Sequence, residues 1–185
     1  GRMYIPRMEE VLALVKPYSA DAGVMINIEL KNGGVRYEGM EEKILALVKK
    51  YDMEAHVLYS SFNPDSLRML KELDPQVSTG ILSGDVRECA RMEADCLADA
   101  LHPSAESILE HGVEPGKQAD AVFAEDGSSG EEALRAGGRP VRGWNGREPF
   151  YKETRYPVQY NLWTLAQRGM TDFITNVPEE YLRED

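Results

Sequence analysis

The chain of 185 residues has the length of one domain with a substantial core, and its 42% hydrophobic and 29% charged residues are ordinary for a globular protein. Its formal net charge of −11 disfavours nucleic acid and anionic membrane surfaces as partners, because these carry charge of the same sign. No apolar run reaches the roughly 20 residues that span a bilayer, so we expect no stable membrane insertion.

The two cysteines, Cys89 and Cys96, are too few for a disulfide scaffold and lack the spacing of zinc ligands. We therefore interpret them as free thiols. The chain does not open with a charged segment followed by an apolar one, as a signal peptide would. The localisation stays open: the cytoplasm is favoured, and secretion requires that a leader has been removed.

Hydrophobic spacing and turn residues predict helices that alternate with strands. In chain order we predict a helix at 5–17, a strand at 24–30, a helix at 39–52, a strand at 56–62, a helix at 63–75, a strand at 77–82, a helix at 85–96, a strand at 97–103, helices at 104–112 and 131–138, a strand at 139–145, a helix at 159–169 and a strand at 170–176. Two segments, 113–130 and 146–158, show no clear pattern. This alternation predicts an α/β protein with a parallel sheet covered by helices.

Residues at the helix ends support these boundaries. Pro17 and Pro75 are predicted to stop the first and third helices, because proline has no backbone N–H to donate. Asn63 and Ser104 are predicted N-caps of the helices that follow them.

The strand at 24–30 ends in charged residues. Because side chains alternate along a strand, Asn27, Glu29 and Lys31 share one face. The apolar residues of the opposite face are Ile26, Ile28 and Leu30. Burying a charge without a partner is costly, so the polar face meets either water or a functional site.

Polar and aromatic residues recur where the predicted strands end. These residues are Glu29, Lys31, Ser60, Ser61, Phe62, His102, Trp144, Asn145, Thr175 and Asn176. The carboxyl ends of parallel strands share one side of a sheet, which is where α/β proteins bind ligands. A simpler interpretation is also open: Glu29 and Lys31 form a solvated ion pair, His102 is a structural histidine, and Trp144 belongs to the core.

Several segments resemble, in the same order, segments of the glycerophosphodiester phosphodiesterase family. INIELK at 26–31 resembles the central carboxylate strand of that family, and HVLYSSFNPDSLRMLKELDP at 56–75 resembles its "SSF…LRxLKxLxP" unit. The other matching segments are YIPRMEEVLAL at 4–14, STGIL at 78–82, ADALHP at 98–103, RPVRGWN at 139–145 and TDFITNVPEEY at 171–181. The resemblance covers the chain except for about 113–130 and 146–158.

The resemblance implies a TIM barrel that hydrolyses glycerophosphodiesters to glycerol 3-phosphate and an alcohol, with Mg²⁺ or Ca²⁺ as cofactor. In this resemblance Glu29 corresponds to the third carboxylate ligand of the metal. Lys31 corresponds to the catalytic lysine near the phosphate, and Phe62 and Trp144 correspond to substrate-binding positions at the pocket mouth.

The family's His-Arg-Gly motif, its early strand that carries Glu-x-Asp, and its second His-Asp do not occur in this sequence. We therefore expect residues 1–185 to form one N-terminally truncated domain, an incomplete (β/α)8 barrel of about six strands that lacks the first two. Such a chain would be inactive alone. It could be a fragment of a full enzyme, a degenerate non-catalytic domain with a binding or structural role, or one part of a barrel completed by another chain. An open α/β sheet of unrelated function is the remaining alternative.

An incomplete barrel would leave two unpaired edges, at the strand 24–30 and the strand 171–176. The apolar residues expected to flank this opening are Val24, Ile26, Ile28, Phe173 and Ile174. We expect another chain or a segment outside this sequence to cover these edges, and the chain to be poorly stable without such a cover.

Overall fold

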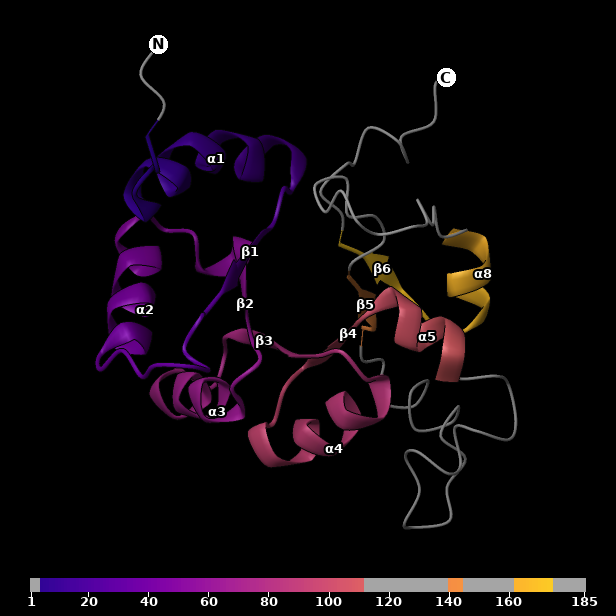
Figure 1. The fold of residues 1–185 in the computed structure, drawn as a ribbon. Helices are drawn as coiled ribbons and strands as arrows, with labels where there is room; N and C mark the ends of the chain where they lie inside the picture. The colour runs from indigo at the N-terminus through magenta and orange to yellow at the C-terminus, as the bar shows by residue number, and fades with distance from the viewer. Residues whose placement is uncertain (1–3, 112–139, 145–161, 175–185) are drawn as a thin grey trace. The chain divides into compact units, whose positions relative to one another are not determined.

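The computed structural model describes residues 4–111, 140–144 and 162–174, and the chain divides into two compact units, Gly1–Gly80 and Ile81–Asp185. Helices and strands alternate along the described residues (Figure 1). This order confirms the predicted α/β fold with a parallel sheet. The helix predicted at 131–138 and the segments 113–130 and 146–158 lie outside the described residues.

The first unit is built around two parallel strands. Its elements are α1 (Met8–Ala22), β1 (Ile26–Glu29), α2 (Met40–Lys50), the short 3₁₀ helix η1 (Glu54–His56), β2 (Val57–Ser61) and α3 (Pro64–Leu73). Ile26 lies opposite Val57, and Glu29 lies opposite Ser60. Strand β3 (Ser78–Ser83) runs from the first unit into the second, and the strand order is β1-β2-β3-β4.

Helix α1 is longer than the sequence predicts, because it continues through Pro17 to Ala22. An internal proline removes one helical hydrogen bond and destabilises a helix by roughly 3 kcal/mol. Contacts at the end of the helix compensate for this loss. Gly23, at φ 67°, donates its N–H to the Ser19 carbonyl, and the buried Ser19 hydroxyl donates to the Val24 carbonyl at 2.7 Å. The predicted stop at Pro17 is therefore wrong.

The predicted cap of α3 is confirmed. The Asn63 side-chain oxygen accepts a hydrogen bond from the Asp65 N–H at 3.0 Å, and Pro64 occupies the first helical position. Buried apolar residues of the three helices and of β2 form the core of this unit, among them Leu12, Val48, Val57, Leu67 and Leu70. Each such side chain contributes roughly 1.5–3 kcal/mol when fully buried.

The two faces of β1 differ in exposure as the alternation predicts. Ile28 and Leu30 are buried, whereas Asn27, Glu29 and Lys31 are exposed. The expectation that Ile28 lies exposed beside an open edge is therefore wrong, because its side chain points into the core. Val24 is exposed, as expected, and the neighbouring Met25 is exposed as well.

The second unit also consists of parallel strands and helices. Its remaining elements are α4 (Val86–Cys96), β4 (Ala100–Pro103), α5 (Ala105–His111), β5 (Arg142–Gly143), α8 (Leu162–Gln167) and β6 (Asp172–Phe173). Strands β5 and β6 are parallel, and parallel bridges join Leu101 to Val141 and Ser104 to Trp144. The core cluster of this unit is Ala105, Ile108, Val141, Leu165 and Met170. The Ser104 hydroxyl accepts from the Ser107 N–H at 3.1 Å, which confirms the predicted cap of α5.

Gly143 and the two cysteines of this unit are tightly packed. A Cβ atom at Gly143 would lie 2.8 Å from the Met170 sulfur and 3.1 Å from the Ile108 Cδ1 atom, so a larger residue would have to displace these side chains. Both cysteines are free, as predicted, and both are buried. Burial raises the pKa of Cys89 to about 12, so its thiol is protonated and unreactive near neutral pH.

Candidate functional site

Glu29 and Lys31 stand at the carboxyl end of β1 and contact each other. The Lys31 ammonium donates to the Glu29 carboxylate at 2.7 Å. The Lys31 side chain is 79% exposed and the Glu29 side chain 31% exposed. An ion pair this exposed contributes little to stability, typically below about 1 kcal/mol. The pair is therefore free to exchange its partner for a ligand at small cost.

Phe62 directly follows β2 and is largely exposed, at 48%. The parallel register ends with Glu29 opposite Ser60, and Lys31 and Phe62 follow these residues at the same ends of β1 and β2. The predicted catalytic lysine and the predicted substrate-binding phenylalanine thus belong to one end of the first unit.

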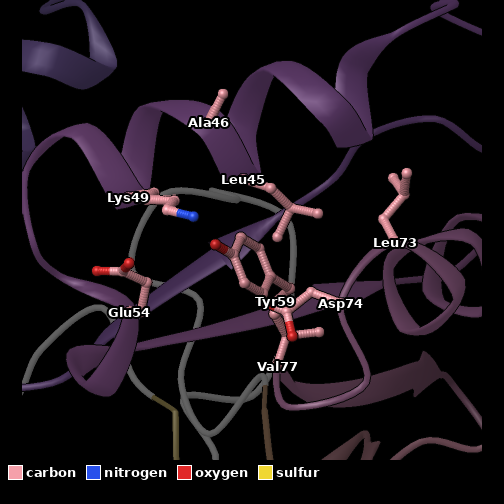
Figure 2. Close-up of a pocket in the computed structure, with 8 residues that line it drawn as sticks. All are labelled: Leu45, Ala46, Lys49, Glu54, Tyr59, Leu73, Asp74 and Val77. Carbon is pink, nitrogen blue, oxygen red and sulfur yellow. The ribbon is translucent and has the colours of Figure 1, made fainter.

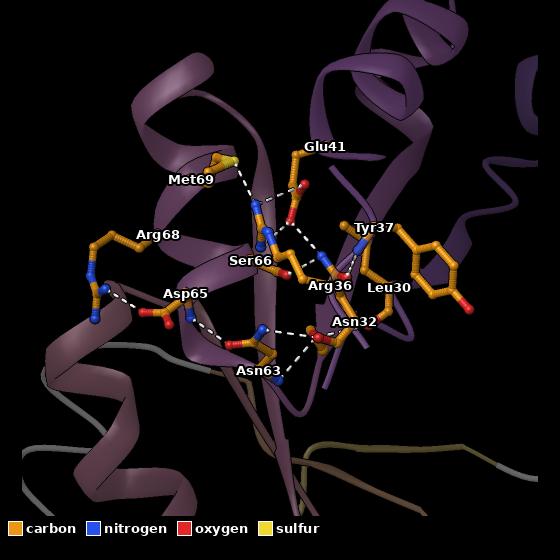
Figure 3. A network of polar contacts seen from close by, with 11 residues as sticks. Leu30, Asn32, Arg36, Tyr37, Glu41, Asn63, Asp65, Ser66, Arg68 and Met69 are labelled. Atoms are coloured by element: carbon orange, nitrogen blue, oxygen red, sulfur yellow. Dashed lines mark hydrogen bonds and ion pairs between the residues drawn. The ribbon is translucent and has the colours of Figure 1, made fainter. Parts of the chain in front are cut away.

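A buried polar network begins at Asn32, the residue after Lys31 (Figure 3). Asn32, Glu41, Ser61 and Ser66 are all at most 2% exposed. The Asn32 amide donates to Glu41 at 3.0 Å and to the Ser66 hydroxyl at 3.1 Å. Arg36 reaches the same Glu41 carboxylate at 3.1 Å. The carboxylate of Glu41 is thus buried with both an ion-pair partner and a hydrogen-bond donor.

This network was not predicted from the sequence, although the pattern of residues contains a signal for it. Period-2 alternation places Asn32 on the same face as Ile28 and Leu30, the buried face of the strand. Glu41 likewise stands seven residues before the buried Val48 and so shares its helix face. A polar residue at a core position predicts a buried hydrogen bond.

The second unit positions Trp144 beside β4. The Trp144 indole N–H donates to the His102 carbonyl at 2.8 Å, and backbone bonds join Trp144 to Pro103 and Ala105. The residue is half-buried. Its predicted role at the pocket mouth remains a prediction.

His102 takes part in a row of charged and polar side chains across β4, β5 and β6. Arg142 donates to the His102 Nε2 atom at 3.4 Å, and Arg142 pairs with Asp172 at 3.4 Å. Since a guanidinium can only donate, Nε2 must accept and the proton of the neutral ring lies on Nδ1. Among the described residues Nδ1 has no hydrogen-bond partner, and the side chain is completely buried. The interpretation of His102 as structural fits this environment.

Burial, and then the charge of Arg142, lower the pKa of His102 to about 4. Between pH 6.5 and 4 the unfolded chain therefore binds a proton that the native state does not, and stability falls as the pH is lowered through this range. We expect this residue to account for a loss of about 3 kcal/mol. Denaturant unfolding at pH 7 and pH 4.5 measures this loss in the free energy of unfolding, for the wild type and for His102→Asn. The variant should lose clearly less stability than the wild type, and equal losses would contradict this assignment.

A pocket in the first unit has a lining that includes neither Glu29 nor Lys31 (Figure 2). Its lining residues are Leu45, Ala46, Lys49, Glu54, Tyr59, Leu73, Asp74 and Val77. Glu54 precedes β2 and Val77 precedes β3, so the pocket opens near the amino ends of these strands. Burial, together with Glu54 and Asp74, raises the pKa of Tyr59 above its usual range. The pocket does not coincide with the predicted site.

Within residues 4–111, 140–144 and 162–174 there is no group of three or more His, Cys, Asp or Glu side chains that could hold a metal ion. In the same described ranges no helix has the length and apolar character needed to cross a membrane.

Comparison with known proteins connects these features to one family. The profile of the Glycerophosphoryl diester phosphodiesterase family matches residues 1–180. The chain is 43% identical over 86 residues to a glycerophosphodiester phosphodiesterase of Bacillus altitudinis, covering 46% of this chain and 34% of that protein. A glycerophosphodiester phosphodiesterase of Caldanaerobacter subterraneus subsp. tengcongensis is 36% identical over 115 residues, covering 62% of this chain and 46% of that protein. The chain thus spans less than half the length of these curated relatives.

Solved structures share the fold over a similar part of their length. A glycerophosphodiester phosphodiesterase from Parabacteroides distasonis superposes with a TM-score of 0.63 at 15% identity, covering 95% of this chain and 61% of that chain. An Oleispira antarctica phosphodiesterase in complex with its product, sn-glycerol-3-phosphate, has a TM-score of 0.57 at 18% identity and covers 95% of this chain and 59% of that chain. At these identities the likeness establishes the fold alone.

Proposed function

The chain belongs to the Glycerophosphoryl diester phosphodiesterase family, and from this premise we propose that it is part of a metal-dependent phosphodiesterase that hydrolyses glycerophosphodiesters to glycerol 3-phosphate and an alcohol. The fold we propose for the whole protein is a TIM barrel, of which this chain supplies an incomplete part. The observation that carries the proposal is the exposed Glu29–Lys31 pair at the end of β1, at 2.7 Å.

The proposed roles follow from the chemistry of each side chain. Lys31 is an exposed ammonium on a flexible stem, and it would bind the phosphate and offset the negative charge that develops during hydrolysis. Phe62, exposed on the opposite strand end, would pack against the apolar part of the substrate. The role proposed for Trp144 is substrate binding.

The described residues alone do not fit a Mg²⁺ or Ca²⁺ site. Such cations take about six or more oxygen ligands, often from several carboxylates. Glu29 supplies a single carboxylate, and one of its oxygens already accepts a hydrogen bond from the Lys31 ammonium. We therefore propose Glu29 as a single ligand of the metal, with the others supplied by residues outside the described part of this protein or by another chain.

The alternative function is a non-catalytic barrel domain with a binding or structural role. The same ion pair is also compatible with this alternative, because two oppositely charged side chains can bind each other without a ligand. The two functions differ in one measurable property, which is the recognition of a phosphate group by Lys31.

We expect the chain to bind glycerol 3-phosphate, and Lys31→Ala to weaken the binding at least about tenfold, because a hydrogen bond to a charged group contributes roughly 1.5–3 kcal/mol. Titration calorimetry with and without Mg²⁺ measures the affinity. Lys43→Ala, which removes an exposed lysine of α2, is the control with the same change in net charge. Equal affinity of the wild type and Lys31→Ala would contradict the proposed role of Lys31.

A further inference from the structure

We infer that Asn32 is a positioning residue that joins two tight turns and thereby holds Lys31 and Phe62 in fixed relative places. This inference rests on the proposed function, which assigns Lys31 and Phe62 to the site. The turns are residues 30–32 after β1 and residues 61–63 after β2, and we call them the paired turns.

Each of the paired turns has a site residue at its centre. The Asn32 N–H donates to the Leu30 carbonyl at 3.0 Å, which closes a three-residue turn around Lys31. The Asn63 N–H donates to the Ser61 hydroxyl at 3.0 Å, which closes a turn around Phe62. Both side chains are therefore presented from the apex of a hydrogen-bonded turn.

Two further hydrogen bonds join one turn to the other. The Ser61 hydroxyl donates to the Leu30 carbonyl at 2.8 Å, and the Asn63 side-chain amide donates to the Asn32 carbonyl at 3.2 Å. The residues on both sides of Lys31 are thus bonded to the residues on both sides of Phe62. Because of these two hydrogen bonds, a displacement of one turn must also displace the other.

The side chain of Asn32 anchors this assembly in the protein interior. Its oxygen accepts from the Tyr37 N–H at 2.7 Å, which fixes the orientation of the amide, because an N–H can only donate. Both protons of its nitrogen then point to Glu41 and Ser66. Asn32 is only 2% exposed, so no water competes for these contacts.

The anchor connects the paired turns to both neighbouring helices. Glu41 lies in the first turn of α2, and Ser66 lies in the first turn of α3. Asn32 is the one residue of this network that contacts both helices through its side chain and the turn around Phe62 through its carbonyl (Figure 3). Removal of its side chain would therefore release the paired turns from α2 and α3. The bonds that close and join the turns would remain, because backbone groups and the Ser61 and Asn63 side chains make them.

Asn32→Ala tests this inference in the whole chain, with ¹⁵N relaxation and glycerol 3-phosphate titration as readouts. We expect the backbone order parameters at Lys31 and Phe62 to fall from about 0.85 toward 0.6, the range of flexible segments. The affinity for glycerol 3-phosphate should fall roughly tenfold. Ser19→Ala is the matched control, because it also removes a hydrogen bond made by a buried side chain, here from the Ser19 hydroxyl to the Val24 carbonyl, which precedes β1 and is not part of the paired turns.

A second variant covers the case in which Asn32→Ala does not fold. Asn63→Asp removes the donor to the Asn32 carbonyl and keeps the oxygen that caps α3. It should loosen the same two residues. Unchanged order parameters in a folded variant, or equal loosening in Ser19→Ala, would overturn the inference. If the wild type binds no glycerol 3-phosphate, the proposed function fails, and the order parameters still decide whether Asn32 positions the turns.

Discussion

The chain of 185 residues should release glycerol 3-phosphate from glycerophosphocholine only at the background rate. General acid–base catalysis is typically worth 10²–10⁴-fold and needs a titratable group beside the substrate. The three histidines do not provide one. His102 is buried and bonded to Arg142, His56 precedes β2, and His111 ends α5.

An enzymatic assay of glycerol 3-phosphate release, with Mg²⁺ or Ca²⁺ present, measures this rate. The Bacillus altitudinis relative serves as the positive control, and Glu29→Ala as the test for any residual activity. A rate close to that of the relative, abolished by Glu29→Ala, would show that this chain carries a complete catalytic site. A background rate that rises when a second polypeptide completes the barrel would support the proposed incomplete domain.

Arg36→Ala should lower the free energy of unfolding by about 3 kcal/mol or more. Glu41 is completely buried, and Arg36 supplies the positive charge that faces its carboxylate at 3.1 Å. Removal of the arginine leaves a buried carboxylate with the Asn32 amide as its remaining side-chain hydrogen-bond donor among the described residues. One neutral donor does not compensate for the lost hydration of a carboxylate.

Arg68→Ala is the matched control for this prediction. It also removes an arginine from an ion pair, with Asp65 at 2.6 Å, but both side chains of that pair are largely exposed. An exposed pair contributes about 0–1 kcal/mol, so the control should remain close to the wild type. Denaturant unfolding at neutral pH gives both values. Similar losses in the two variants would mean that burial of Glu41 does not set the strength of its pair.

The sequence by itself determined the features that depend on local rules. The order of helices and strands follows from apolar spacing, and the caps at Asn63 and Ser104 follow from short-range hydrogen bonding. The exposed face of β1, with Glu29 and Lys31, follows from the alternation of side chains. The family could also be predicted, because its motifs occur in order along the chain.

Only the tertiary structure decided how distant segments satisfy their polar groups. Helix α1 continues through Pro17 because contacts at Ser19 and Gly23 stabilise its end, and local propensity does not include such contacts. The positioning role inferred for Asn32 depends on Glu41 and Ser66, which the tertiary fold brings to its side-chain amide. These partners stand 9 and 34 residues away in the chain, and a buried polar atom takes whichever donor or acceptor the fold brings to it.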